Sequence, residues 1–164
     1  MGKIIGIGNA MTDILVKLKD DPLLTTHNWP KGSTQFILHK DMMRIQELTT
    51  PMCPQKVSGG SSANTIKAMA ELGIDTGYIG KVGNDKTGDD YISYLNSLGI
   101  KTHIHRSNLP SGIATTFIST DGQRTFVDYL GAAATIDTYD IDPQYFQNYS
   151  YVYIEGYLVQ NHMV

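Results

Sequence analysis

The segment Lys56–Gly73, with the sequence KVSGGSSANTIKAMAELG, constrains the fold of this chain more than any other feature. The adjacent glycines Gly59 and Gly60 predict a tight turn, and the apolar residues that follow recur at helical spacing until Gly73, a typical C-cap glycine. A helix that begins after Gly-Gly-Ser-Ser presents free backbone N–H groups at its positive end, so a polar ligand can approach the main chain. The alternative is that the glycines only form the turn and that a serine only caps the helix.

A short apolar run near the N-terminus, Ile4–Ile7, predicts a strand that is buried on both faces. It is followed by the sequence GNAMTD, which places Asn9 and Asp13 at or just beyond the C-terminal end of the strand. Ligands bind at this edge in open α/β sheets. An asparagine amide both donates and accepts, and a carboxylate offers two acceptor oxygens to a pair of neighbouring hydroxyls. The alternative is that Asn9 is a turn residue and Asp13 a cap.

Composition narrows the class of protein. The chain has 164 residues, 41% of them hydrophobic, which suits one domain with its own core. The formal net charge is −3 with both signs interspersed, so neither nucleic acid nor a membrane surface is expected as a partner. The N-terminus lacks the regions of a signal peptide, no apolar run spans a bilayer, and the single cysteine excludes an intrachain disulfide. We therefore expect a cytoplasmic protein.

The order of the predicted elements indicates an α/β fold. After a strand-rich start, strands and helices alternate, a pattern typical of a mostly parallel sheet with a small β appendage. The dipeptide Asp121-Gly122 lies between two strand-like segments and predicts a hairpin. The expected elements are strands at 34–38, 76–82, 102–106, 113–119, 124–129 and 151–154, and helices at 41–48, after the double glycine, and up to Gly99.

Two glycine motifs fall short of nucleotide-binding signatures. Gly6–Met11 begins like a dinucleotide fingerprint, but Met11 replaces the third glycine that close helix packing needs. Gly80–Thr87 is similar to a P-loop, but Asp85 occupies the position of its second glycine, where an anionic side chain would face the phosphates. The five histidines show no metal-ligand spacing to cysteine or carboxylates. The residues themselves therefore predict neither a nucleotide site nor a metal site.

Three stretches together resemble the PfkB, or ribokinase-like, family of sugar and nucleoside kinases. They are Gly8–Asp13, Gly59–Asn64 and Gly80–Gly88. Two further stretches, Ser111–Ala114 and Asp121–Thr125, match the central hairpin of the family. The four-residue step from Asn9 to Asp13 and the serine at position 61 are similar to the adenosine-kinase-like branch. The resemblance covers nearly the whole chain.

The resemblance implies a ribokinase-like fold, in which a mostly parallel sheet is flanked by helices and carries a small β-sheet lid. The lid strands are expected around residues 14–18, 33–38 and 102–129. Family members are about twice as long, and their later half carries a Gly-Ala-Gly-Asp motif with the catalytic Asp, the magnesium-organising motif and the ATP pocket. No Gly-Ala-Gly-Asp occurs in this sequence. We therefore expect residues 1–164 to be the N-terminal part of one such domain, without its C-terminal ATP-binding half and without a catalytic residue.

The resemblance also implies which residues bind the acceptor substrate. In the family, the first Asn and Asp and the Gly-Gly…Asn segment hold the substrate hydroxyls, and a lid strand closes over the sugar. Some sugar kinases of the family keep a substrate-contacting carboxylate at the position of Glu155. Independently of the resemblance, the small, loop-like residues 130–134 are able to approach a ligand or a neighbouring strand. The expected substrate-binding residues are Asn9, Asp13, Gln35, Gly59, Gly60, Ser61, Asn64, Leu130, Ala132 and Glu155.

Two functions follow from this interpretation. The first is ATP-dependent phosphorylation of a sugar or nucleoside hydroxyl, in which this chain supplies the acceptor site, is inactive alone, and relies on the absent half for most contacts to ATP and Mg²⁺. The second is a non-catalytic sugar- or nucleoside-binding module, or one half of a split kinase. A nicotinamide-dependent oxidoreductase ranks third because the glycine fingerprint is incomplete. The family also allows a homodimer through the lid, and the strand at 151–154 is expected to expose an apolar face that favours association.

Overall fold

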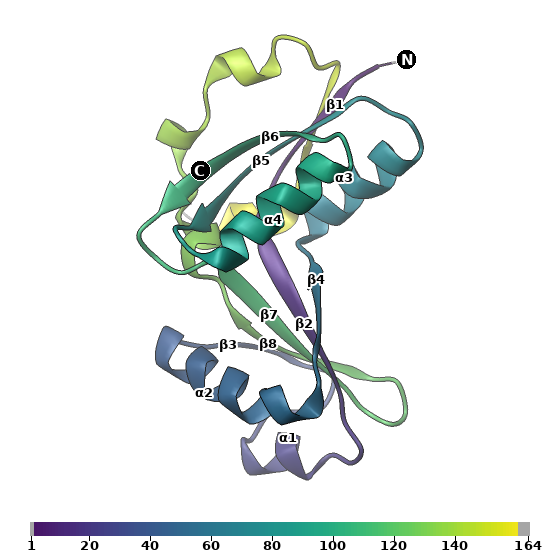
Figure 1. Cartoon of the computed structure of the whole chain (residues 1–164), viewed down its shortest axis with the longest axis vertical. Coiled ribbons are helices and arrows are strands. Elements are labelled where there is room, and N and C mark those ends of the chain that lie inside the picture. The colour runs from purple at the N-terminus through teal and green to yellow at the C-terminus, as the bar shows by residue number, and fades with distance from the viewer. Residues whose placement is uncertain (1, 161–164) are drawn as a thin grey trace.

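The computed structural model describes residues 2–160 and contains two β-sheets, one at each end of the molecule's long axis (Figure 1). A four-stranded sheet has the order β6-β5-β1-β9, and a five-stranded sheet has the order β3-β8-β7-β2-β4. Strand β1 (Ile4–Ile7) leads through Gly8–Ala10 into β2 (Met11–Lys17). The chain therefore crosses from one sheet to the other at the position where the sequence predicts ligand-binding residues.

The four-stranded sheet is parallel throughout. Strand β1 lies between β5 (Thr76–Gly83) and β9 (Tyr151–Ile154), and β6 (Lys101–Ser107) pairs with the other side of β5. Helices α3 (Ser61–Glu71) and α4 (Lys86–Ser97) cover one face of this sheet (Figure 1). Helix α3 leads into β5, and α4 connects β5 to β6. A helix before the next strand returns the chain to the start of the sheet, so that the strands can pair in parallel.

The core of the parallel sheet follows the period-two alternation of strand side chains. Tyr78 and Val82 of β5 are buried against Ile66 of α3, whereas Ile79 faces the other side and contacts Ile136. The chain after the five-stranded sheet covers this second face with short 3₁₀ turns. These turns are η2 (Gly131–Thr135), η3 (Thr138–Asp140), η4 (Pro143–Phe146) and η5 (Gly156–Gln160).

The five-stranded sheet forms the lid. Its strands besides β2 are β3 (Thr34–Phe36), β4 (Gln55–Ser58), β7 (Gly112–Ile118) and β8 (Arg124–Tyr129). Its outer face is covered by α1 (Pro22–Thr26), α2 (His39–Thr49) and the turn η1 (Thr50–Met52) (Figure 1). Leu24 of α1 and Ile45 of α2 are buried with Phe117 and Val127 of the sheet. The inner face is left for the cavity described below.

The carboxylate of Asp85 links the two sheets. It caps α4 by accepting a hydrogen bond from the Gly88 N–H (2.8 Å), and it also accepts from the Ser111 N–H (2.8 Å) and Oγ (2.7 Å), one residue before β7. The Gly83 N–H donates to the same Ser111 Oγ (2.9 Å). The loop that is similar to a P-loop in sequence therefore has a structural role here, since its acidic side chain fixes the lid to the parallel sheet.

The predicted fold class is confirmed, with one correction. The mostly parallel sheet flanked by helices, the β-sheet lid and the hairpin at Asp121-Gly122 are all present. Residues 101–107, however, which we expected within the lid range 102–129, form β6 of the parallel sheet. The reason is that β6 follows β5 and α4, and the short turn at Gly99 returns the chain parallel to β5.

Strand β9 is one of the two edge strands of the parallel sheet within the described residues. Tyr151, Val152 and Ile154 are 65%, 49% and 56% exposed, so the expected exposed apolar face is confirmed. The association that we expect from this face stays a prediction. Within residues 2–160, no helix has the length and apolar character needed to cross a membrane.

Candidate functional site

A cavity of about 430 Å³ lies between the inner face of the lid and the C-terminal ends of β1 and β9. From the lid and the residue after β8 come Met11, Asp13, Thr34, Phe36, Ala114, Phe126, Asp128 and Leu130. From the ends of β1 and β9 and the start of α3 come Asn9, Gly60, Ser61, Asn64, Glu155 and Tyr157. The cavity therefore combines apolar lid side chains with polar groups at the edge of a parallel sheet, where ligands commonly bind.

The Glu155 carboxylate joins the three elements that form the base of the cavity. Its Oε1 accepts a hydrogen bond from the Asn9 N–H (2.7 Å), and its Oε2 accepts from the Ser61 Oγ and the Ser62 N–H (both 2.9 Å). The side chain is only 4% exposed. A buried carboxylate is stable when donors satisfy it in this way. Glu155 therefore fixes the end of β1 and the first turn of α3 relative to each other.

The side chain of Asn9 is 7% exposed and lines the cavity. Its Oδ1 is buried and has no hydrogen-bond partner among the described residues. A buried amide oxygen without a donor costs about 1–3 kcal/mol. A ligand hydroxyl that donates to Oδ1 would remove this cost, so Asn9 is suited to bind one.

The carboxyl group of Asp13 lies on the inner face of the lid. Burial raises the pKa of this carboxyl, and the nearby Lys67 ammonium opposes the rise. Among the described residues, none donates a hydrogen bond to the carboxylate of Asp13. Gly59 lies directly against this carboxyl, because a Cβ at position 59 would overlap its atoms. The double glycine therefore makes room for a carboxylate whose acceptor positions are left for a ligand.

A second lid carboxyl, that of Asp128 on β8, lines the same cavity. Its Oδ1 is buried without a hydrogen-bond partner among residues 2–160. Burial raises the pKa of the Asp128 carboxyl to about 7, and the charge of Asp13 adds to the rise. The cavity thus contains two lid carboxyl groups, and the charge of Asp13 favours the protonated form of Asp128.

We expect Asp128→Asn to stabilise the protein more at pH 8 than at pH 5. With a pKa of about 7 when folded and an ordinary value of 3.8, the folded state binds more protons between these values, so Asp128 lowers stability as the pH rises through this window. Allowing for partial solvent screening, the variant should gain about 1–2 kcal/mol on going from pH 5 to pH 8, or about 3–6 °C. Thermal melts of both proteins at the two pH values measure this. Asp20→Asn, at an exposed position, serves as the control, and an equal gain at both pH values would contradict the prediction.

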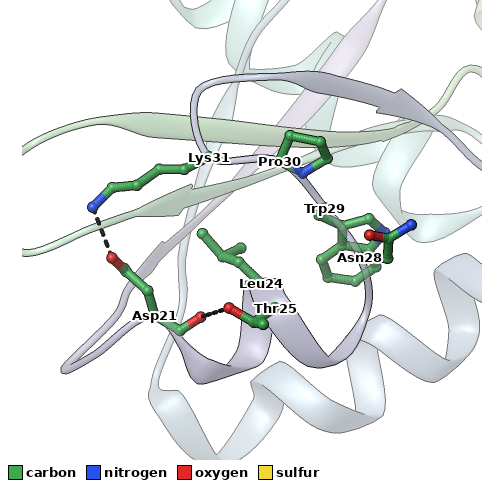
Figure 2. A pocket seen from close by; sticks show the side chains of 7 residues that line it. All are labelled: Asp21, Leu24, Thr25, Asn28, Trp29, Pro30 and Lys31. Atoms are coloured by element: carbon green, nitrogen blue, oxygen red, sulfur yellow. Dashed lines mark hydrogen bonds and ion pairs between the residues drawn. The ribbon is translucent and has the colours of Figure 1, made fainter.

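A second cavity, of about 350 Å³, lies beside α1, away from every residue that we expected to bind substrate (Figure 2). Lys31 forms ion pairs there with Asp21 (2.7 Å) and Asp121 (2.8 Å), which tie the loop after α1 to the β7–β8 hairpin. Trp29 stacks on Phe117, with ring centroids 5.5 Å apart. The residues of this cavity are thus used in packing α1 against the lid.

Comparison with known proteins identifies the family. The model of the pfkB family carbohydrate kinases matches residues 33–163. This chain belongs to the PfkB family. Adenosine kinase 2 of Arabidopsis thaliana is 25% identical over 136 residues, and 5-dehydro-2-deoxygluconokinase of Geobacillus kaustophilus is 34% identical over 124 residues. The crystal structure of adenosine kinase from Sinorhizobium meliloti has a TM-score of 0.87 and 27% identity to this chain.

This PfkB chain spans less than half of the length of each of these relatives. The matches cover 80% of this chain and 39% of the Arabidopsis protein, and 73% of this chain and 35% of the Geobacillus protein. The match to the Sinorhizobium structure covers 99% of this chain and 49% of the Sinorhizobium chain. The comparisons therefore establish the family of this chain, whereas the activity and substrates of the whole protein are proposals.

The structure brings most of the expected substrate-binding residues of this PfkB chain to one cavity. Asn9, Asp13, Gly60, Ser61, Asn64, Leu130 and Glu155 line it. Gly59 does not line the cavity but contacts Asp13 from behind, and its N–H donates to the Met11 carbonyl (2.8 Å).

Two of the expected residues lie elsewhere. Gln35 pairs with Val127 on the outer face of the lid, and its Nε2 donates to the Ser33 Oγ (2.9 Å). Because side chains alternate along β3, Thr34 and Phe36 line the cavity and Gln35 does not. Substrate binding by Gln35 stays a prediction that its position in the lid does not support. Ala132 is fully buried, with its N–H donating to the Pro110 carbonyl (2.8 Å), and does not line the cavity.

Sequence reasoning identified Asp13 and Leu130 but missed the other lid residues that line the cavity, above all Asp128. The signal was present, because an aspartate between Val127 and Tyr129, inside the strand-like segment Arg124–Tyr129, has low strand propensity. Phe126 lies two residues earlier on the same face. The strand pattern alone did not indicate which face is turned toward a ligand.

Proposed function

We propose that this chain supplies the acceptor site of an ATP-dependent kinase that phosphorylates a hydroxyl group of a nucleoside or a sugar. The observation that carries the proposal is a pair of free acceptors in one cavity, the carboxylate of Asp13 and the Oδ1 of Asn9. A ligand with several hydroxyl groups would satisfy both. The name of one of the similar proteins, adenosine kinase, agrees with an acceptor of this kind.

The proposed roles follow from the chemistry of each side chain. Asp13 accepts hydrogen bonds from two neighbouring hydroxyls of the acceptor, and Asn9 and Asn64 bind further hydroxyls. Glu155 does not need to touch the acceptor, because its oxygens already hold Asn9 and the start of α3. Phosphoryl transfer depends mainly on positioning and on charge stabilisation, so an acceptor held in one orientation has already lost much of the entropy that the reaction would cost.

We further propose that ATP and Mg²⁺ are bound mostly by residues outside this chain. Within residues 2–160, no three His, Cys, Asp or Glu side chains are grouped closely enough to hold a metal ion. The side chains that line the cavity are suited to hydroxyl and ring contacts, and none of them is a lysine or arginine that would pair with a phosphate. This chain would therefore contribute acceptor recognition to the complete kinase.

We expect Asp13→Asn in the full-length protein to reduce kcat/KM for the acceptor about 10–100-fold, since a hydrogen bond to a charged group contributes about 1.5–3 kcal/mol. The assay is phosphoryl transfer from ATP to adenosine and to a series of neutral sugars. Asp20→Asn, which removes an exposed carboxylate, should leave kcat/KM unchanged. If Asp13→Asn turns over the acceptor as well as the wild type, the proposed site is wrong. Acceptor binding without turnover under any condition would instead indicate a binding module.

A further inference from the structure

The charged side chains that line the cavity are all acidic. Its lining includes three carboxyl groups, those of Asp13, Asp128 and Glu155, and no lysine, arginine or histidine. The charge of Lys67 acts on Asp13, but the Nζ of Lys67 donates to the Ser58 carbonyl (2.5 Å) and lies 5.7 Å from the centre of the Tyr94 ring. Lys67 is not part of the lining. A ligand in the cavity therefore meets acidic side chains without a basic one.

The two lid carboxyl groups stand on either side of one small residue. Asp13 of β2 pairs with Ala114 of β7, and Ala114 pairs with Asp128 of β8, so the three lie in one row on the inner face. Neighbouring strands are about 4.8 Å apart, which puts the backbones of the two aspartates about 10 Å apart. Since an alanine separates them, a ligand ring above Ala114 can reach both carboxylates with hydroxyls on its opposite edges.

The surroundings of Asp128 suit a ring more than an ion. Phe126 lies two residues before it on the same face, and Phe36 of β3 pairs with it in register. Aromatic and apolar side chains exclude water and offer a surface to a sugar ring or a base. They provide no donor to neutralise a negative group that enters beside Asp128.

We propose that Asp128 is a specificity-determining residue that restricts the acceptor to uncharged polyhydroxylated compounds, nucleosides or neutral sugars, and excludes sugar acids and sugar phosphates. The inference rests on the proposed function, because it names the substrate class of the same site. Through its carboxylate, which lines the cavity, Asp128 accepts a hydrogen bond from a neutral acceptor, and together with Asp13 it repels an anionic one. Two carboxylates within about 6 Å of an anionic group disfavour it by about 100-fold or more in affinity.

The test uses matched pairs of probes in which one CH₂OH group of the neutral member is replaced by a carboxylate. These are adenosine against adenosine 5′-carboxylate, and D-glucitol against D-gluconate. Binding to the full-length protein is measured by calorimetry at pH 8, where the Asp128 carboxyl, whose pKa burial raises to about 7, is charged. In at least one pair the wild type should bind the neutral member about 100-fold more tightly. Asp128→Asn should reduce that ratio about tenfold, mainly by improving binding of the anionic member.

Two control variants separate charge from shape. Asp128→Glu keeps the charge and should keep the preference for the neutral probe. Asp20→Asn removes an equal charge from an exposed position and should leave the ratio unchanged.

Each remaining outcome has a definite meaning. If the wild type binds the anionic and neutral members of each pair it recognises with similar affinity, or if Asp128→Asn leaves the ratio unchanged, the inference is wrong. The kinase proposal then still stands on the Asp13→Asn result. If the wild type binds neither member of either pair and phosphorylates no polyhydroxylated acceptor, the proposed function is wrong, and the inference is overturned with it.

Discussion

Replacing Glu155 by alanine is expected to lower the free energy of unfolding by about 3–5 kcal/mol and to abolish acceptor binding. The substitution leaves three donors without their acceptor: the Asn9 N–H, the Ser61 hydroxyl and the Ser62 N–H. It also opens a cavity at a position that is 96% buried, since Glu155 is only 4% exposed. Binding should be lost because the end of β1, which carries Asn9, is no longer held against α3.

Urea unfolding and acceptor calorimetry on the same samples measure both effects. Glu47→Ala, an exposed glutamate of α2, is the matched control and should change stability by less than about 0.5 kcal/mol. Glu155→Gln should lie between the two, because its amide oxygen still accepts from Asn9 while its NH₂ group faces the donors of α3. A loss below about 1 kcal/mol for Glu155→Ala would show that the network does not hold the site.

Gly60→Ala is expected to destabilise the protein by about 3–4 kcal/mol. Gly60 precedes α3 with φ at 91°, a conformation that residues with a Cβ rarely adopt. A Cβ at this position would also overlap the carbonyl oxygen of Asn9, a backbone atom that cannot rotate away. The substitution therefore forces either α3 or the end of β1 out of place.

Gly99→Ala provides a matched control for the clash. Gly99 has a similar φ of 75°, but a Cβ there would have no atom within 4 Å. Gly99→Ala should lower the free energy of unfolding by about 1 kcal/mol, which is the cost of the left-handed conformation alone. The difference between the two free energies of unfolding isolates the contact with Asn9. Equal losses for the two variants would mean that the chain around Gly60 relaxes without cost.

Local sequence patterns predicted those elements whose turn residues and apolar spacing lie within the element itself or directly beside it. The double glycine before α3, the hairpin at Asp121-Gly122 and the apolar runs of β1 and β9 depend on neighbouring residues only, and all were identified. The residues beside the glycine turns also gave the polar base of the cavity. These features could be predicted because turn chemistry and side-chain periodicity act over a few residues.

The inner face of the lid could not be predicted in this way. Which side of β3 faces the cavity depends on its register with β8, and a shift of one residue exchanges Gln35 for Phe36. The partnership of Asp13 and Asp128 requires the pairing of β2 with β7 and of β7 with β8, across more than a hundred residues of sequence. Residues 101–107 join the parallel sheet by pairing with β5, the strand that precedes α4, and not with a lid strand.

The hydrogen bond from the Asn9 N–H to Glu155 joins residues 146 positions apart, and β1 pairs with β5 and β9, both synthesised after it. During translation, β1 leaves the ribosome long before either neighbouring strand exists. A nascent chain that ends before β9 has the segments for the lid, α3 and α4, yet its glycine turn has no carboxylate to hold it. We therefore expect ligand binding to begin only when the last described strand is in place, which makes it a late event in synthesis and folding.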